Sequence, residues 1–163
     1  MKTRTHRTAF LIAASFLFAC NGQKQADPTV IIPANGNIIA HEIVYDVEIK
    51  NPNPEDQWMD EALMGLDHEA LVDFVFEGIY SGRFTVFEIF EGTPIKTQKI
   101  IEMEEGGEFS RNQIGKFQFM EEWVVDPEQM TFSKKVTEIR MGLQKFNREG
   151  YLTGYAPLFR VVL

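Results

Sequence analysis

The sequence predicts a single α+β domain, in which a mostly antiparallel sheet carries one or two packed helices. Its 163 residues, of which 44% are hydrophobic and 25% charged, can build one ordinary core but not two. Residues 41–50 and 116–125 alternate apolar and polar side chains, which is the period of a strand with one wet face. Segments typical of strands and helices do not alternate regularly along the chain, which disfavours a doubly wound parallel sheet.

Residues 1–19 are expected to be a signal peptide. Residues 1–7 are positively charged without an acidic residue, and residues 9–19 are apolar apart from Ser15. This apolar run is shorter than the about 20 residues that a spanning helix needs. Residues 17–20 read Leu-Phe-Ala-Cys and resemble the lipobox of bacterial lipoproteins. The resemblance implies that Cys20 is acylated, with palmitate among its fatty acids, and becomes the first residue of the mature chain.

The lipid anchor would be followed by a linker and then by the folded domain. Residues 20–36 are expected to be a lipid-anchored flexible linker, because residues 21–28 are polar and turn-rich, and residues 37–163 to be the α+β domain. No acidic cluster of the kind that resembles a surface-export signal directly follows Cys20. The expected location is therefore the cell envelope, at the outer membrane facing the periplasm. The alternative is a secretory signal followed by a free surface cysteine.

The mature chain would be strongly acidic. Removing residues 1–19 takes away three of the 16 Lys and Arg residues and leaves 13 of them against 24 Asp and Glu, a formal charge of −11. Such a chain repels phosphate backbones, so nucleic acid is excluded as a partner. It is also repelled by an anionic lipid surface, so the lipid would tether a domain that does not lie flat on the bilayer.

A strand over residues 41–50 is expected to open the domain and to end where Pro52 and Pro54 remove ladder donors. Its apolar face comprises Ile43, Tyr45, Val47 and Ile49. A short helix over residues 57–66 is expected to follow, with Trp58, Leu63 and Leu66 as its apolar contacts.

The clearest helix of the sequence begins after Asp67, which can cap it, and ends before Gly82, which supplies a left-handed stop. Its apolar positions recur at steps of three and four residues and are Leu71, Phe74, Val75, Gly78 and Ile79. Residues 83–90 are expected to form a strand. Residues 96–104 fit either a helix or a strand.

Three further strands are expected in the second half of the domain. Residues 116–125 place Phe117, Phe119, Glu121 and Trp123 on one face, and residues 126–129 turn the chain. Residues 131–143 form a long strand in which Phe132 and Val136 are out of phase with Ile139, Met141 and Leu143, which indicates a β-bulge. Residues 147–154 are expected to be a loop and residues 158–163 the last strand.

No motif for a catalytic, cofactor or metal centre stands out. After the signal peptide the chain has two histidines, His41 and His68, and Cys20 as its lone cysteine, which excludes the zinc sites built from these residue types. Ser81 has no neighbouring base, and His68 is expected to be solvated in the first turn of a helix. The sequence therefore predicts a protein that is not an enzyme and that has no cofactor and no metal.

The acidic residues Glu121, Glu122 and Asp126 are the one group that could serve acid/base chemistry or bind a cation. Neighbouring residues of a strand point to opposite faces, so Glu121 and Glu122 are not expected to converge. The interpretation as strand residues without such chemistry is favoured.

Aromatic residues make up 12% of the chain and can serve either of two purposes. Most are expected to fill the core, where strands use them for cross-strand packing. The others would anchor a partner-binding surface, because aromatic side chains are enriched at the centres of interfaces. The candidates for core or interface anchors are Trp58, Phe119, Trp123 and Phe159.

Several blocks of the second half share residues with one known family. Residues 78–87 read Gly-Ile-Tyr-Ser-Gly-Arg-Phe-Thr-Val-Phe, residues 119–126 read Phe-Met-Glu-Glu-Trp-Val-Val-Asp, and apolar strands follow at residues 139–143 and 158–161. These blocks resemble the gliding-motility N protein family, whose members are subunits of the type IX secretion and gliding machinery. The resemblance covers residues 78–163 and implies a similar fold and a scaffold-like role.

The sequence thus predicts a non-enzymatic envelope lipoprotein that acts as an interaction or scaffold subunit, and the resemblance implies a gliding-motility or type IX secretion assembly. The expected partners are envelope proteins and, through the lipid, the membrane, and a homo-oligomer is compatible with the sequence. One alternative is a small-molecule or glycan-binding lipoprotein in which Trp58 or Trp123 stacks on the ligand. Another is a hydrolase that uses Glu122 and Asp126.

Overall fold

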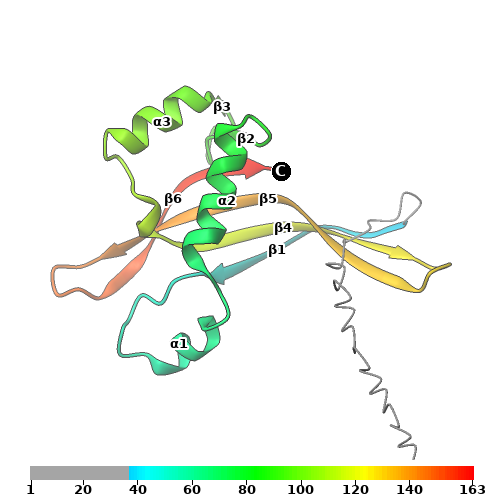
Figure 1. Cartoon of the computed structure of the whole chain (residues 1–163), viewed down its shortest axis with the longest axis horizontal. Coiled ribbons are helices and arrows are strands. Elements are labelled where there is room, and N and C mark those ends of the chain that lie inside the picture. The colour runs from blue at the N-terminus through cyan, green and yellow to red at the C-terminus, as the bar shows by residue number, and fades with distance from the viewer. Residues whose placement is uncertain (1–36) are drawn as a thin grey trace, which may run out of the picture. The chain divides into compact units, whose positions relative to one another are not determined.

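A six-stranded antiparallel sheet, with the strand order β1-β4-β5-β6-β2-β3, is the framework of the molecule. The computed structural model describes residues 37–163, which form the predicted α+β domain (Figure 1). The expected signal peptide, Cys20 and the expected linker lie outside the described residues. The strands are β1 (Asn37–Glu48), β2 (Thr85–Phe87), β3 (Pro94–Ile95), β4 (Ile114–Asp126), β5 (Thr131–Phe146) and β6 (Leu152–Val162). The helices are α1 (Gln57–Leu63), α2 (His68–Tyr80) and α3 (Thr97–Glu105), and η1 (Arg111–Gln113) is a 3-10 turn.

The hydrophobic core lies between α2 and one face of the sheet. Phe119, Ile139 and Val161 are cross-strand neighbours on this face, and Phe117 and Met141 form the next row. Phe76 of α2 packs against this face, and its ring contacts those of Phe109 and Phe159 at centroid separations of 5.7 and 6.1 Å. The side chains of α2 that are at most 1% exposed are Val72, Val75, Phe76 and Ile79.

The opposite face of the sheet is polar. Asp46, Gln118, Arg140 and Arg160 are cross-strand neighbours on β1, β4, β5 and β6. The Glu138 carboxylate accepts hydrogen bonds from Arg140 and Arg160 at 2.8 and 2.7 Å. The alternation of apolar and polar residues therefore gives the sheet the one buried and one solvated face that the sequence predicted, since one face packs under α2 and the other meets water.

A β-bulge in β5 is present where the phase of its apolar residues changes. Met120 pairs with Glu138 and Glu121 with Val136, so Thr137 is the extra residue. Its hydroxyl donates a hydrogen bond to the Met120 carbonyl at 3.2 Å. The bulge brings Val136 to the core face together with Ile139, which confirms the predicted irregularity.

Both ends of α2 follow the sequence prediction. The Asp67 carboxylate accepts a hydrogen bond from the Ala70 amide at 2.9 Å, and Gly82 ends the helix at a φ of +72°. The expected apolar stripe is wrong at Phe74, which is 51% exposed. Val72 and Phe76, which the stripe omitted, are buried, because Val72, Val75, Phe76 and Ile79 follow the spacing that faces the sheet.

Two other expected boundaries differ from the structure, and the structure decides one assignment that the sequence left open. The strand expected over residues 83–90 is confined to β2, because Glu88 and Thr93 close a turn in which Gly92 has a φ of +67°. Residues 96–104 are helical as α3, which buries Ile100. The last strand begins at Leu152, six residues before the expected start at 158, because β6 pairs with β5 as far as Phe146.

The helix expected over residues 57–66 is shorter and packs differently. α1 ends at Leu63 and contains no buried residue, so Trp58 does not contact the core. Within residues 37–163, no helix is long and apolar enough to cross a membrane.

We expect Gly78→Ala to destabilise the domain. A Cβ at Gly78 would lie 2.1 Å from the Phe84 ring, whereas a Cβ at Gly65 meets no atom within 4 Å. Because the half-buried ring of Phe84 must shift, Gly78→Ala should lower the free energy of unfolding by about 1–3 kcal/mol. Gly65→Ala is the control and should change it by less than about 0.5 kcal/mol. Urea denaturation measures both, and equal effects of the two variants would contradict the packing described for Gly78.

Candidate functional site

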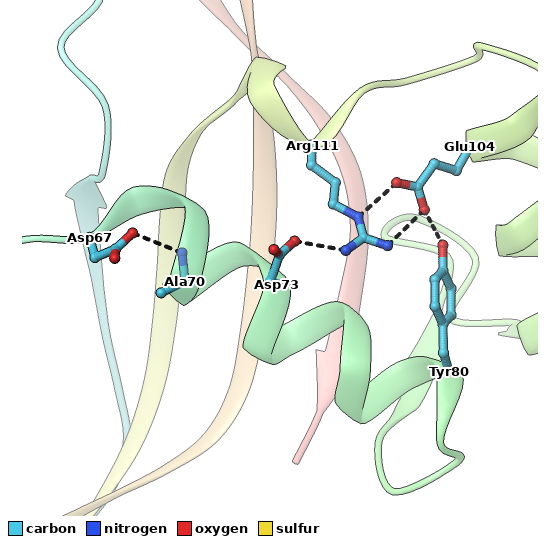
Figure 2. A network of polar contacts seen from close by, with 6 residues as sticks. All are labelled: Asp67, Ala70, Asp73, Tyr80, Glu104 and Arg111. Atoms are coloured by element: carbon cyan, nitrogen blue, oxygen red, sulfur yellow. Dashed lines mark hydrogen bonds and ion pairs between the residues drawn. The ribbon is translucent and has the colours of Figure 1, made fainter.

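A network of charged side chains centred on Arg111 joins α2, α3 and η1. Its guanidinium donates hydrogen bonds to Glu104 at 2.7 and 3.1 Å and to Asp73 at 2.7 Å (Figure 2). The hydroxyl of Tyr80 also donates to Glu104. The Arg111 guanidinium lies over the Phe76 ring, 4.5 Å from its centroid. One side chain thus ties together two helices and the turn that leads into β4.

The environment of this network determines the protonation of its members. Burial raises the pKa of Tyr80 to about 12, and the hydrogen bond to Glu104 adds to the effect. Burial alone would also raise the pKa of Glu104, but the hydrogen bonds from Arg111 and Tyr80 outweigh it and the pKa lies below its usual value. At neutral pH the carboxylate is therefore ionised and the phenol neutral.

A cleft of about 400 Å³ borders the network. His68 lines it, and its Nε2 is 2.7 Å from the carbonyl oxygen of Ile114. The expectation of a solvated His68 is therefore wrong, because the ring is half-buried and joins the start of α2 to β4. Arg111 donates hydrogen bonds to both Glu104 and Asp73, so the cation of this cleft is already engaged by two carboxylates, which is the arrangement of a structural tie.

The connection between β1 and α2 carries exposed apolar side chains. We refer to residues 51–69, which contain α1 and the first two residues of α2, as the α1 segment. Trp58 is 72% exposed and Met64 86% exposed. Leu66 is 36% exposed, at the end of the same segment. Large apolar side chains that are gathered on one surface element and do not serve the core are typical of contact surfaces.

Polar contacts hold the α1 segment in place of core packing. The Asp56 carboxylate caps α1 by accepting a hydrogen bond from the Met59 amide at 3.1 Å. The Asn51 amide donates to the Asp56 carbonyl at 3.1 Å and to the Asp60 carboxylate at 2.7 Å. Just before the segment, the Lys50 ammonium donates to the backbone carbonyl and the side-chain oxygen of Asn112 at 2.7 and 2.6 Å.

These contacts connect the α1 segment to the Arg111 tie. Asn112 directly follows Arg111 in η1, so the element that Arg111 holds also receives Lys50. A groove of about 490 Å³ lies between the start of the segment and the turn of β5 and β6, where Pro52 and Phe146 are among its lining residues. The segment is therefore anchored at its base and open on its outer surface.

The four aromatic residues that the sequence selected lie in different places. Phe159 is 0% exposed and belongs to the centre of the core. Phe119 is half-buried and contacts Phe117 and Tyr45 with its ring. Trp58, in α1, and Trp123, in β4, do not lie in the buried core cluster. Of the four candidates, Phe159 is therefore a central core residue, Phe119 lies at the edge of the core, and the two tryptophans lie outside the core.

Trp123 belongs to a cluster around the buried carboxylate of Glu121, which is 4% exposed. This carboxylate accepts hydrogen bonds from the Tyr45 hydroxyl at 2.5 Å and from the Trp123 indole at 3.2 Å. The Lys134 ammonium lies 3.7 Å from Glu121 and 5.2 Å from the centroid of the Trp123 ring. Burial, followed by the contact with Glu121, raises the pKa of Tyr45 to about 12.

The acidic residues Glu121, Glu122 and Asp126 do not converge. Glu121 lies under Tyr45 and Trp123, whereas the Glu122 carboxylate is 3.7 Å from the His41 ring. The Asp126 carboxylate accepts hydrogen bonds from the amides of Glu128 and Gln129 at 2.9 and 3.0 Å and so forms the β4–β5 turn. Among the residues that the structure describes, no group of three or more His, Cys, Asp or Glu could hold a metal ion.

The residues of the Arg111 network were not selected from the sequence. Asp73, Glu104 and Arg111 lie on three separate elements, and the contact of Arg111 with Asp73 spans 38 positions. The α1 segment had a local signal, because six of its 19 residues are Asp or Glu and none is Lys or Arg.

The sequence matches no known protein-family model, and no curated protein is significantly similar to it. The functional argument therefore rests on the surfaces of this chain.

Removing the central cation should weaken the domain. We expect Arg111→Met to lower the free energy of unfolding by about 1–3 kcal/mol, because it leaves Glu104 and Asp73 without their partner. Lys99→Met is the control, since the Lys99–Glu108 pair is 3.9 Å apart with both side chains 57% exposed. It should cost less than about 1 kcal/mol. Equal losses of unfolding free energy in Arg111→Met and Lys99→Met, measured by urea denaturation, would show that the Arg111 contacts do not stabilise the domain.

Acid should act through the same network. The pKa of Glu104 is lowered by folding, so its contribution is present above its unfolded pKa of about 4.3 and is lost as the pH falls through the folded pKa. Below about pH 4.3 the free energy of unfolding should therefore fall more steeply with pH in the natural chain than in Glu104→Gln. Glu105→Gln, at the neighbouring exposed position, should leave the slope unchanged. Urea denaturation midpoints measured across this pH range test the prediction. Parallel plots of midpoint against pH for the natural chain and both variants would contradict it.

Proposed function

We propose that the protein is a non-enzymatic lipoprotein of the bacterial cell envelope that acts as an interaction subunit through the α1 segment. The observation that carries the proposal is the exposure of Trp58, at 72%, on a helix that buries none of its residues. Such a helix contributes little to the core and is nevertheless held by Asp56 and Asn51. A preformed element with an exposed tryptophan is the arrangement in which interface anchors are found.

The amino-terminal sequence supports the envelope location. Residues 17–20 resemble a lipobox, and acylation of Cys20 would place the domain at the membrane through a linker of residues 20–36. The domain carries 12 Lys and Arg against 23 Asp and Glu over residues 37–163 and is repelled by anionic lipid. A tethered acidic domain remains available to protein partners at the membrane surface.

A gliding-motility or type IX secretion assembly is the proposed setting. The resemblance that supports it covers residues 78–163, which run from the end of α2 to the end of the chain. In those residues Phe159 is a core residue and Arg160 lies over the Phe87 ring, 4.3 Å from its centroid. A scaffold role follows from the resemblance, whereas the contact surface proposed here precedes the matched residues.

The second candidate function is binding of a small molecule or glycan. The exposure of Trp58 favours it as well, because an exposed indole is a platform on which a sugar ring can stack. Trp123 is less suited, since its ring already contacts Phe132 at a centroid separation of 5.6 Å and lies under Lys134.

Crosslinking in cells tests the interaction subunit. A photoreactive phenylalanine analogue at position 58 should form an adduct with another envelope protein, whereas the same analogue at position 90 should not. Phe90 is the matched control because it is 86% exposed but lies in the turn between β2 and β3. Cys20→Ser should release the protein from the membrane fraction and abolish the adduct. A membrane-bound protein that forms no adduct at position 58 would overturn the proposal.

Tryptophan fluorescence separates the two candidate functions. Acrylamide should quench the natural chain strongly, and Trp58→Phe should remove the accessible part of the emission because Trp123 is half-buried. Envelope oligosaccharides added to the natural chain should leave the emission unchanged if the surface serves a protein. A saturable change that disappears in Trp58→Phe would favour the glycan-binding function instead.

A further inference from the structure

We propose that the α1 segment binds a basic segment of a partner protein in which cationic and apolar side chains are interspersed. This inference rests on the proposed function, and it adds the chemistry of the partner.

The charge of the α1 segment supports a basic partner. Residues 51–69 contain no Lys or Arg, and their six acidic residues are Glu55, Asp56, Asp60, Glu61, Asp67 and Glu69. Asp56 and Asp67 cap helices, and Asp60 accepts a hydrogen bond from Asn51. Glu55, Glu61 and Glu69 are exposed, and none of the six acids forms an ion pair within residues 37–163. A partner with cations would supply the opposite charge.

The apolar side chains require more of the partner than charge. Trp58 and Met64, which lie between these acidic residues in the sequence, are 72% and 86% exposed, and Leu66 is 36% exposed. Burying them against a purely hydrophilic polycation would gain little, since the hydrophobic term scales with the apolar area removed from water. The surface therefore fits a segment that presents apolar side chains between its cations.

The same charges argue against other occupants. A second copy of this chain would bring together two domains with 12 basic and 23 acidic residues each, and their net charges repel one another. An anionic bilayer is repelled for the same reason. A basic segment gains from the carboxylates of the α1 segment, and salt should weaken its binding.

The first experiment uses a defined probe, a short synthetic peptide of alternating leucine and lysine, and the full-length mature chain in detergent. Isothermal titration calorimetry should show binding at least about tenfold tighter than for a leucine–glutamate or a serine–lysine peptide. Binding should weaken between about 0.05 and about 0.5 M salt. Equal affinity for the serine–lysine peptide would overturn the apolar part of the proposal, and no effect of salt would overturn its charged part.

Two charge-reversal variants locate the surface. Glu55→Lys, Glu61→Lys and Glu69→Lys together should weaken binding of the leucine–lysine peptide about tenfold or more. The control reverses three exposed acids on other elements, Glu88, Glu91 and Glu105, to lysine and changes the net charge equally. The control should retain the affinity to within about twofold. Equal loss in the two variants would show a general charge effect and overturn the proposal.

A separate readout distinguishes failure of this inference from failure of the proposed function. The adduct formed at position 58 in cells should contain a partner peptide with a net positive charge, identified by mass spectrometry. It should be lost in the first triple variant and kept in the control. An adduct that persists in the first variant, or that contains this chain itself, overturns the basic partner while the interaction subunit stands. Absence of any adduct overturns both.

Discussion

The arrangement of the helices in this domain depends on the hydrogen bonds that the Arg111 guanidinium donates to Asp73 and Glu104. Arg111 holds α2 through Asp73 and α3 through Glu104, and it belongs to η1, which leads into β4. The next residue of η1, Asn112, accepts hydrogen bonds from the ammonium of Lys50, two residues after β1 ends. The tie therefore reaches from the helices that cover the core to the base of the α1 segment. Because the Arg111 guanidinium is already paired with two carboxylates, the cleft beside it is part of the framework, and the exposed apolar surface lies on the α1 segment.

The sheet explains why its centre does not provide that surface. One face is covered by α2, and the other carries a polar row that includes Arg140 and Arg160, paired through Glu138. Over the centre of the sheet, the apolar face is thus covered and the uncovered face is polar. The α1 segment joins β1 to α2 and buries none of the residues of its helix, so Trp58 and its acidic neighbours remain accessible. Polar capping gives this segment a defined shape without removing its apolar side chains from water.

The candidate site could be anticipated from the sequence only in part. Trp58 was selected as a core or interface anchor, but the sequence placed it against the core. That expectation failed because the short helix is held by Asn51 and Asp56 and contains no buried residue. The expectation for His68 was wrong in the opposite sense, because its ring was expected to be solvated and is half-buried. The ring forms a hydrogen bond with the carbonyl of Ile114, which is 46 positions away. In both cases the neighbours that decide burial are distant in the chain.

The sequence by itself determined the local features of this protein. These local features are the strand phases, the bulge at Thr137, the cap at Asp67 and the stop at Gly82. Each depends on residues within a few positions of one another, and covalent geometry decides which of these residues can make contact. Tertiary structure alone decided which tryptophan is exposed and that Arg111 meets Asp73 and Glu104. Those outcomes depend on how separate elements pack, and a contact that spans 38 positions leaves no periodic trace in the chain.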